Sequence, residues 1–98
     1  MRIRDGYDFD VLVNEAERMV IDELERNLNR RSDPSICVCQ DCVLDMAAYA
    51  LNHLHPVYRV SLLGSMYAHS MNEGSFRDEV KANVTEAINK IHDNPSHD

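Results

Sequence analysis

The residues best suited to chemistry in this sequence are three cysteines that lie within six positions: Cys37, Cys39 and Cys42. Thiolates are soft ligands for Zn²⁺, and the two-residue gap between Cys39 and Cys42 lets one loop present two sulfurs to one ion. The alternatives are buried free thiols, or two of the three joined in a disulfide. We favour a metal site, because this chain does not read as secreted and cysteine clusters in such chains are typical of metal binding.

A tetrahedral zinc site needs one more donor than the three cysteines provide. The candidates for the fourth ligand are Asp41, His92, His97, a water molecule and a residue from a second subunit. His53 and His55 are set aside, because a helix from Cys42 to His53 spans about 16 Å. The sequence has no zinc-hydrolase spacing of Glu and His, so we expect the zinc to be structural.

Apolar residues at helical spacing predict a first amphipathic helix over residues 9 to about 30, capped by Asp8 or Asp10. Its apolar face comprises Phe9, Leu12, Val13, Ala16, Met19, Val20, Leu24 and Leu28. Its opposite, solvated face comprises Glu15, Glu17, Arg18, Asp22, Glu23, Glu25 and Arg26. The helix is expected to end before the cluster around Pro34, because proline cannot continue a helix.

The cysteines lead directly into a second helix, predicted over residues 41–54, whose apolar residues cover nearly the whole circumference. A helix of this kind is buried on most sides, and Ala47, Ala48 and Ala50 allow another backbone to approach closely. A chain of 98 residues has a small core and cannot easily surround one helix by itself. We therefore predict a homodimer around this helix.

A third helix is predicted over residues 75–92, with a start at Ser75 to Asp78 that resembles a capping box. Residues 57–63 are β-branched but have no visible partner strand, so we expect an extended connector, followed by a short helical piece around residues 65–70. Residues 1–8 form an N-terminal arm and residues 93–98 a polar tail. The predicted fold is all-α: one domain over residues 1–98 with three main helices and a cysteine-rich metal loop before the central one, in an intertwined homodimer.

The composition is that of a globular chain, with 44% hydrophobic and 28% charged residues. No apolar run reaches the roughly 20 residues of a membrane span, and the N-terminus lacks a secretory signal, so we expect a cytoplasmic protein. The formal charge of −7 argues against direct DNA binding, which needs a concentrated positive face. No Gly-rich phosphate loop, Ser/His/Asp set or paired-carboxylate motif occurs, so we expect no enzymatic activity.

Local basic groups can still bind a small anion through two or three guanidinium groups. Arg59 is the first candidate, because its neighbour Tyr58 can stack on a nucleobase while the guanidinium contacts phosphate. The other candidates are Arg2, Arg4, Arg30 and Arg31.

Three polar residues inside predicted helices are given structural roles: Asp45, Asn14 and Asn52. Asp45 lies in the most apolar helix, and because buried carboxylates need partners we expect it to be an anchor, with Arg59 as the candidate partner. The alternative is that this face of the helix reaches water. Asn14 and Asn52 either form bonds across a helix interface or are solvated.

A longer pattern in the sequence reads Asn14-x-x-Glu17-x-x-Val20, then Cys37-x-Cys39-x-x-Cys42-x-x-Asp45-x-x-Ala48-x-Ala50-Leu51-Asn52-x-Leu54-x-Pro56-x-Tyr58, with Gly64 after it. This pattern resembles the late-competence ComFB family of bacteria. The resemblance covers nearly the whole chain. This sequence departs from the family at His55, where two successive prolines are common.

The resemblance implies a small, cytoplasmic, mostly helical dimer that binds zinc through Cys37, Cys39 and Cys42 and has no enzymatic activity. Some relatives resemble receptors for cyclic di-GMP. Our leading hypothesis is therefore a regulatory protein: a zinc-stabilised dimer that binds a cyclic dinucleotide and signals to a protein partner. The alternative is a structural or protein-interaction dimer, linked to competence, with a structural zinc and no small ligand.

Overall fold

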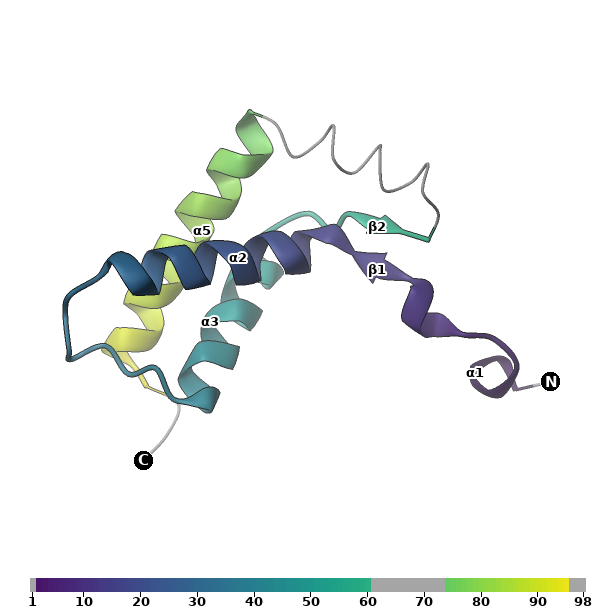
Figure 1. Cartoon of the computed structure of the whole chain (residues 1–98), viewed down its shortest axis with the longest axis horizontal. Coiled ribbons are helices and arrows are strands. Elements are labelled where there is room, and N and C mark those ends of the chain that lie inside the picture. The colour runs from purple at the N-terminus through teal and green to yellow at the C-terminus, as the bar shows by residue number, and fades with distance from the viewer. Residues whose placement is uncertain (1, 61–73, 96–98) are drawn as a thin grey trace.

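Three helices form the body of the protein, and a two-stranded ribbon and an N-terminal arm extend from it (Figure 1). The computed structural model describes residues 2–60 and 74–95. Its elements are α1 (Ile3–Gly6), a 3-10 turn η1 (Phe9–Val11), β1 (Val13–Asn14), α2 (Glu15–Arg30), α3 (Gln40–Asn52), β2 (Tyr58–Arg59) and α5 (Ser75–Asp93). The prediction of a mostly helical fold with three main helices is confirmed.

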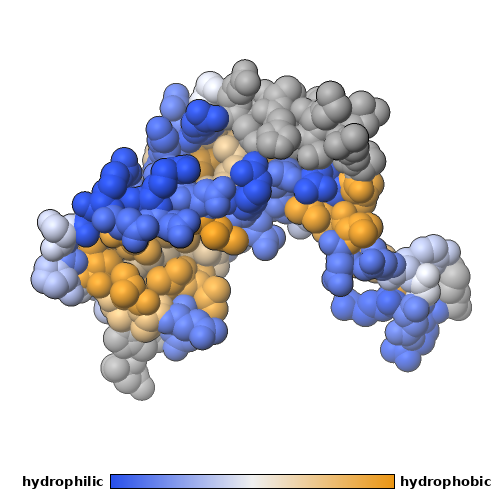
Figure 2. Space-filling view, in the orientation of Figure 1, coloured by the Kyte–Doolittle hydropathy of each residue, from blue (hydrophilic) through white to orange (hydrophobic). Residues whose placement is uncertain are grey.

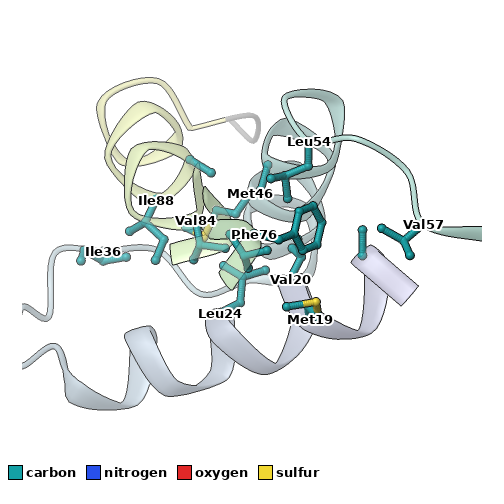
Figure 3. Close-up of a cluster of buried hydrophobic side chains, with 14 residues drawn as sticks. Met19, Val20, Leu24, Ile36, Met46, Leu54, Val57, Phe76, Val84 and Ile88 are labelled. Atoms are coloured by element: carbon teal, nitrogen blue, oxygen red, sulfur yellow. The ribbon is translucent and has the colours of Figure 1, made fainter. Parts of the chain in front are cut away.

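The hydrophobic core lies where α2, α3 and α5 pack against one another. Figure 3 shows how the apolar faces of the three helices meet, with Val20 from α2, Met46 from α3 and Val84 from α5 all fully buried. Ile36 and Val57, from the segments on either side of α3, are also part of this core. The core therefore fixes both ends of α3, including the loop that carries the cysteines.

The first main helix is shorter than predicted, because it begins at Glu15 rather than near Phe9. Asn14 has an extended backbone, and its Oδ1 accepts a hydrogen bond from the backbone N–H of Ala16, 3.2 Å away. This is the geometry of a helix N-cap, so Asn14 is not the helix-interior residue that we predicted. Asp8 caps only the 3-10 turn η1, through the backbone N–H of Asp10.

The connector after α3 does have a partner strand, contrary to our prediction. β1 and β2 pair antiparallel, with Val13 opposite Arg59 and Asn14 opposite Tyr58. The backbone N–H of Glu15 donates to the carbonyl of Val57 at 2.7 Å. The partner was missed because Leu12, Val13 and Ala16 also fit a helical repeat, which hid the two-residue strand in the expected helix.

Within the described part of the chain, α3 is buried on one face rather than all round. Its buried residues, Cys42, Met46 and Ala50, are four positions apart and face the core. Leu44 remains 58% exposed and Ala48 is also exposed. Figure 2 shows apolar surface open below α2, on the side where α3 lies. The predicted homodimer, which would cover this face, stays a prediction.

The last helix closely matches its prediction, since α5 ends one residue later than expected. Its apolar stripe is buried: Phe76, Val80, Val84, Ala87 and Ile88. The predicted capping box is absent, because Ser75 is already helical and the residue before it is Gly74, with φ of 71° and no side chain. The helical piece predicted around residues 65–70 lies outside the described residues.

No helix among the described residues is long and apolar enough to cross a membrane.

Candidate functional site

The three cysteines come together at the start of α3. Their sulfur atoms all lie within 4.8 Å of one another. With Zn–S bonds of about 2.3 Å, a tetrahedral site places sulfurs about 3.8 Å apart. Movements of about 1 Å would therefore close the cluster on one ion, so the donor set fits zinc.

Local structure explains why these sulfurs converge. Cys39 is the N-cap residue of α3, and its Sγ accepts a hydrogen bond from the backbone N–H of Cys42 at 3.4 Å. A helix N-terminus favours negative charge, and so favours thiolates, at this position. Cys42 is fully buried, Cys37 is half-buried and Cys39 is exposed. The cluster therefore lies at the protein surface with its base in the core.

The loop before the cysteines is shaped by Asp33. The Oδ1 atom of Asp33 accepts hydrogen bonds from both the backbone N–H and the hydroxyl of Ser35, at 2.9 and 2.6 Å. These bonds, with smaller effects from His92 and Arg31, lower the pKa of the Asp33 carboxyl below its ordinary value. The turn that results leads to Ile36, which is buried in the core directly before Cys37.

The candidates for the fourth ligand are not equally placed. His92 lies in the last turn of α5 and acts electrostatically on Asp33, so it is near the cysteine loop. Figure 1 shows the end of α5 beside the segment that enters α3. Asp41 is exposed in the first turn of α3, and His97 lies outside the described residues. Bound zinc would supply a structural cross-link between these elements.

A second polar site joins the ribbon to the start of α2. Glu15 is 3% exposed, although its sequence position predicted the solvated face. Its Oε1 accepts from Arg59 Nε at 2.5 Å and its Oε2 from Arg18 Nε at 3.0 Å. These two arginines, Arg59 foremost, lower the pKa of the Glu15 carboxyl against the opposing effect of burial.

Arg59 thus pairs with Glu15 rather than with Asp45, which we proposed as its partner. Asp45 is half-buried and forms no ion pair with the described residues. Asn52 is the exposed last residue of α3. Asn14 bonds to the segment before β2 rather than across a helix interface, because its Oδ1 also accepts from the backbone N–H of Val57 at 2.7 Å.

The predicted ligand-binding arginines lie in three separate places. Arg59 is on the ribbon, whereas Arg2 and Arg4 are on the projecting arm (Figure 1). Arg30 and Arg31 are at the far end of α2, about 22 Å from Glu15 at 1.5 Å per residue. One chain therefore cannot bring the ribbon and the Arg30 end to the same small ligand.

Most of these arginines already have partners in the chain. Arg2 forms an exposed ion pair with Asp5 at 3.4 Å, and Arg30 lies 3.7 Å from Glu23. Arg31 Nε donates to Asn27 Oδ1 at 2.7 Å. The Asn27 amide also donates to Thr85 of α5 at 3.4 Å.

Sequence reasoning missed Glu15, Arg18 and Asn27 as elements of these polar sites. It also placed Glu23 on the solvated face, whereas Glu23 is buried and pairs with Arg26 and Arg30. The available signal for Asn27 was its place on the apolar stripe, between Leu24 and Leu28. The partner of Glu15 could not be read from local sequence, because Arg59 is 44 residues away.

The aromatic and guanidinium groups of Tyr58 and Arg59 do not share one face. Successive side chains of a strand point to opposite sides; Arg59 contacts the buried Glu15, while Tyr58 is 62% exposed. Tyr58 lines a surface hollow of about 550 Å³. The other lining residues are Phe9, Asp10, Leu12, Val13, Asn14, Glu17, Arg18, Ile21 and Asp22. Of the lining residues that the structure describes, Arg18 is the one whose guanidinium shares this hollow with Tyr58.

Comparison with known proteins places the chain in a family. The sequence profile described as late competence development protein ComFB matches residues 13–95. The solved structure of the late competence protein ComFB from Bacillus subtilis is similar, with a TM-score of 0.68 and 23% sequence identity, over 87% of this chain and 94% of that one. No curated protein matches. The profile spans most of the chain, from β1 to beyond α5, and the chain therefore belongs to the late competence development protein ComFB family.

Proposed function

We propose that this protein is a non-enzymatic regulator: a zinc-stabilised homodimer that binds a cyclic dinucleotide, cyclic di-GMP foremost, and signals to a protein partner. The observation that carries the nucleotide site is the fixed guanidinium of Arg59. Its Nε bonds to the buried Glu15 carboxylate, and its side chain is 27% exposed. An arginine held in this way can offer its two terminal nitrogens to a phosphate or a guanine edge with little loss of conformational freedom.

Family resemblance supports the choice of ligand, since some relatives of this chain resemble cyclic di-GMP receptors. The dimer is supported by the apolar face of α3 that this chain leaves uncovered, where Leu44 is 58% exposed. A second copy on that face would bury it. Zinc is supported by the three converging sulfurs. A dimer can also bring together arginines that lie too far apart within one chain.

Calorimetric titration of the purified protein with cyclic di-GMP tests the nucleotide site. We expect binding that weakens with added salt and falls about tenfold or more in Arg59→Ala. Arg77→Ala is the matched control, because Arg77 is exposed on α5 away from the ribbon. No heat at tens of micromolar nucleotide, on the order of ordinary ligand affinities, would rule out the proposal.

Arg59→Ala also leaves Glu15 without its main partner, so a second variant is needed. The double variant Glu15→Gln/Arg59→Ala removes the buried charge together with the arginine. If Arg59 contacts the nucleotide, the double variant stays folded and still binds weakly. If binding returns in the double variant, Arg59 has only a structural role and the nucleotide site lies elsewhere.

Size-exclusion chromatography with light scattering tests the dimer. We expect about 23 kDa, twice the chain mass of 11.3 kDa. Leu44→Glu should shift the protein to monomer, because it places a charge on the exposed apolar face of α3. Ile3→Glu, on the arm, is the control. A compact monomer for the unmodified chain would contradict the proposal.

A protein-interaction dimer without a small ligand is the second candidate function. It is favoured by the arginine pairs, since Arg59, Arg30, Arg31 and Arg2 all bond within the chain. The same titration separates the two candidates, because the second predicts no heat with any cyclic dinucleotide.

A further inference from the structure

We infer that the hollow beside Tyr58 is the docking site for a basic amphipathic segment of another protein. The existence of a protein partner rests on the proposed function, whereas the hollow itself indicates the chemistry of that partner. It concerns the face of the ribbon opposite to Arg59. Among the described residues, four elements build the hollow: η1, β1, the first half of α2, and β2.

The hollow has an apolar wall that this chain leaves exposed. Phe9 is 51%, Leu12 45%, Ile21 55% and Tyr58 62% exposed. Figure 2 shows apolar surface gathered at the ribbon with hydrophilic residues around it. Exposed apolar side chains that gather in a concave surface with a polar rim are typical of protein-interaction sites.

The rim of the hollow is acidic. Among the described lining residues, Asp10, Glu17 and Asp22 contribute three carboxylates and Arg18 contributes one guanidinium, which gives a net charge of −2. Arg18 is itself bonded to Glu15 at 3.0 Å and to Asp22 at 3.3 Å. Its charge is therefore already compensated, and the rim presents a negative potential to a ligand.

This charge excludes several ligands and selects one kind. Nucleic acids, anionic membrane surfaces and dinucleotide phosphates would all be repelled. A symmetric contact with a second copy through this hollow would set the same carboxylates against each other. A segment with large aliphatic residues on one face and Lys or Arg beside them fits both the apolar wall and the acidic rim. Its long basic side chains can lie along the apolar wall and place their charges at the rim.

Fluorescence anisotropy with labelled synthetic peptides tests this inference without any nucleotide. The probe is a 14-residue Leu/Lys peptide with leucines at helical spacing. Two control peptides have Glu in place of Lys, or the same composition scrambled so that no apolar face forms. We expect the Leu/Lys helix to bind, and both controls to bind at least about tenfold more weakly.

Matched variants locate the binding. Ile21→Ser and Asp10→Asn/Glu17→Gln should each weaken binding about tenfold. Ile3→Ser is the control for Ile21, since Ile3 is 53% exposed but lies outside the hollow. Glu25→Gln/Glu79→Gln makes the same charge change elsewhere, at two exposed glutamates. Both controls should retain the affinity of the unmodified protein.

Two results with these variants would overturn the inference. If the control variants lose as much affinity as the hollow variants, the peptide is attracted only by the overall acidic charge. If Ile21→Ser turns a dimer into a monomer in light scattering, a second copy covers the hollow instead. Peptide binding and cyclic di-GMP binding are measured separately on the unmodified protein. Binding of cyclic di-GMP without binding of the Leu/Lys peptide would contradict only this inference. Binding of the peptide without binding of cyclic di-GMP would contradict only the proposed nucleotide site.

Discussion

Arg59 Nε and Glu15 Oε1 lie 2.5 Å apart, although 44 residues separate them in sequence. The bond ties β2 to the first turn of α2 and leaves the carboxylate almost fully buried. Removing one partner of a buried pair leaves an uncompensated charge, which costs more than the pair itself contributes. Several expected outcomes follow from this site and from the cysteine cluster.

Arg59→Ala should lower the free energy of unfolding by about 3 kcal/mol, because Glu15 keeps only Arg18 as a partner. Urea unfolding followed by circular dichroism measures the change. Arg77→Ala, at an exposed position, should stay within about 0.5 kcal/mol of the unmodified protein. Equal stability of the two variants would show that the Glu15–Arg59 bond contributes nothing to the fold.

Stability should also depend on pH through Glu15. Its pKa is lowered in the folded protein below the ordinary 4.5, chiefly by Arg59. The unfolded state then binds the proton more readily, so this stabilisation is complete above 4.5 and is lost as the pH falls through the folded pKa. The stability difference between the unmodified protein and Glu15→Gln should therefore be constant near neutrality and shrink in acid. A difference that grows in acid would have the wrong sign.

Asn14→Ala should cost about 2 kcal/mol, since it removes the N-cap of α2 and leaves the buried N–H of Val57 without its acceptor. Asn29→Ala is a matched control, because Asn29 is exposed in the last turn of α2. The measurement is thermal unfolding of the three proteins at one pH. Similar losses in both variants would mean that the cap and the ribbon bond add no stability.

Protein purified without chelators should contain about one zinc per chain, and Cys39→Ser should reduce that content sharply. Ser32→Ala, in the same loop, should leave it unchanged. Elemental analysis measures the metal content, and mass spectrometry measures whether the cysteines are thiols or disulfides. We also expect chelator treatment to lower the melting temperature, because structural zinc contributes folding free energy. A disulfide in place of metal would refute the zinc site.

The parts of the fold that could be predicted from the sequence are those indicated by residue patterns within a single short stretch of the chain. The stripe of α5 runs uninterrupted from Phe76 to Ile88 and is bounded by Gly74, so its bounds were almost correct. The cysteines are close in sequence, and therefore any loop that turns there brings their sulfurs together.

The parts that it missed depend on contacts between distant residues. Val13 fits the helical repeat, and only its pairing with Arg59 shows that it is a strand residue. Glu15 has the sequence context of a solvated residue, and its burial depends on an arginine supplied by β2.

The Oδ1 atom of Asn14 accepts hydrogen bonds from the amides of both Ala16 and Val57. The start of α2 and the entry to β2 are therefore held by the same atom, and neither can open while that atom keeps both bonds. Local unfolding should expose both amides in a single event, so their rates of hydrogen exchange should rise and fall together. A ligand that stabilises β2 would then also slow hydrogen exchange at the amide of Ala16, in the first turn of α2.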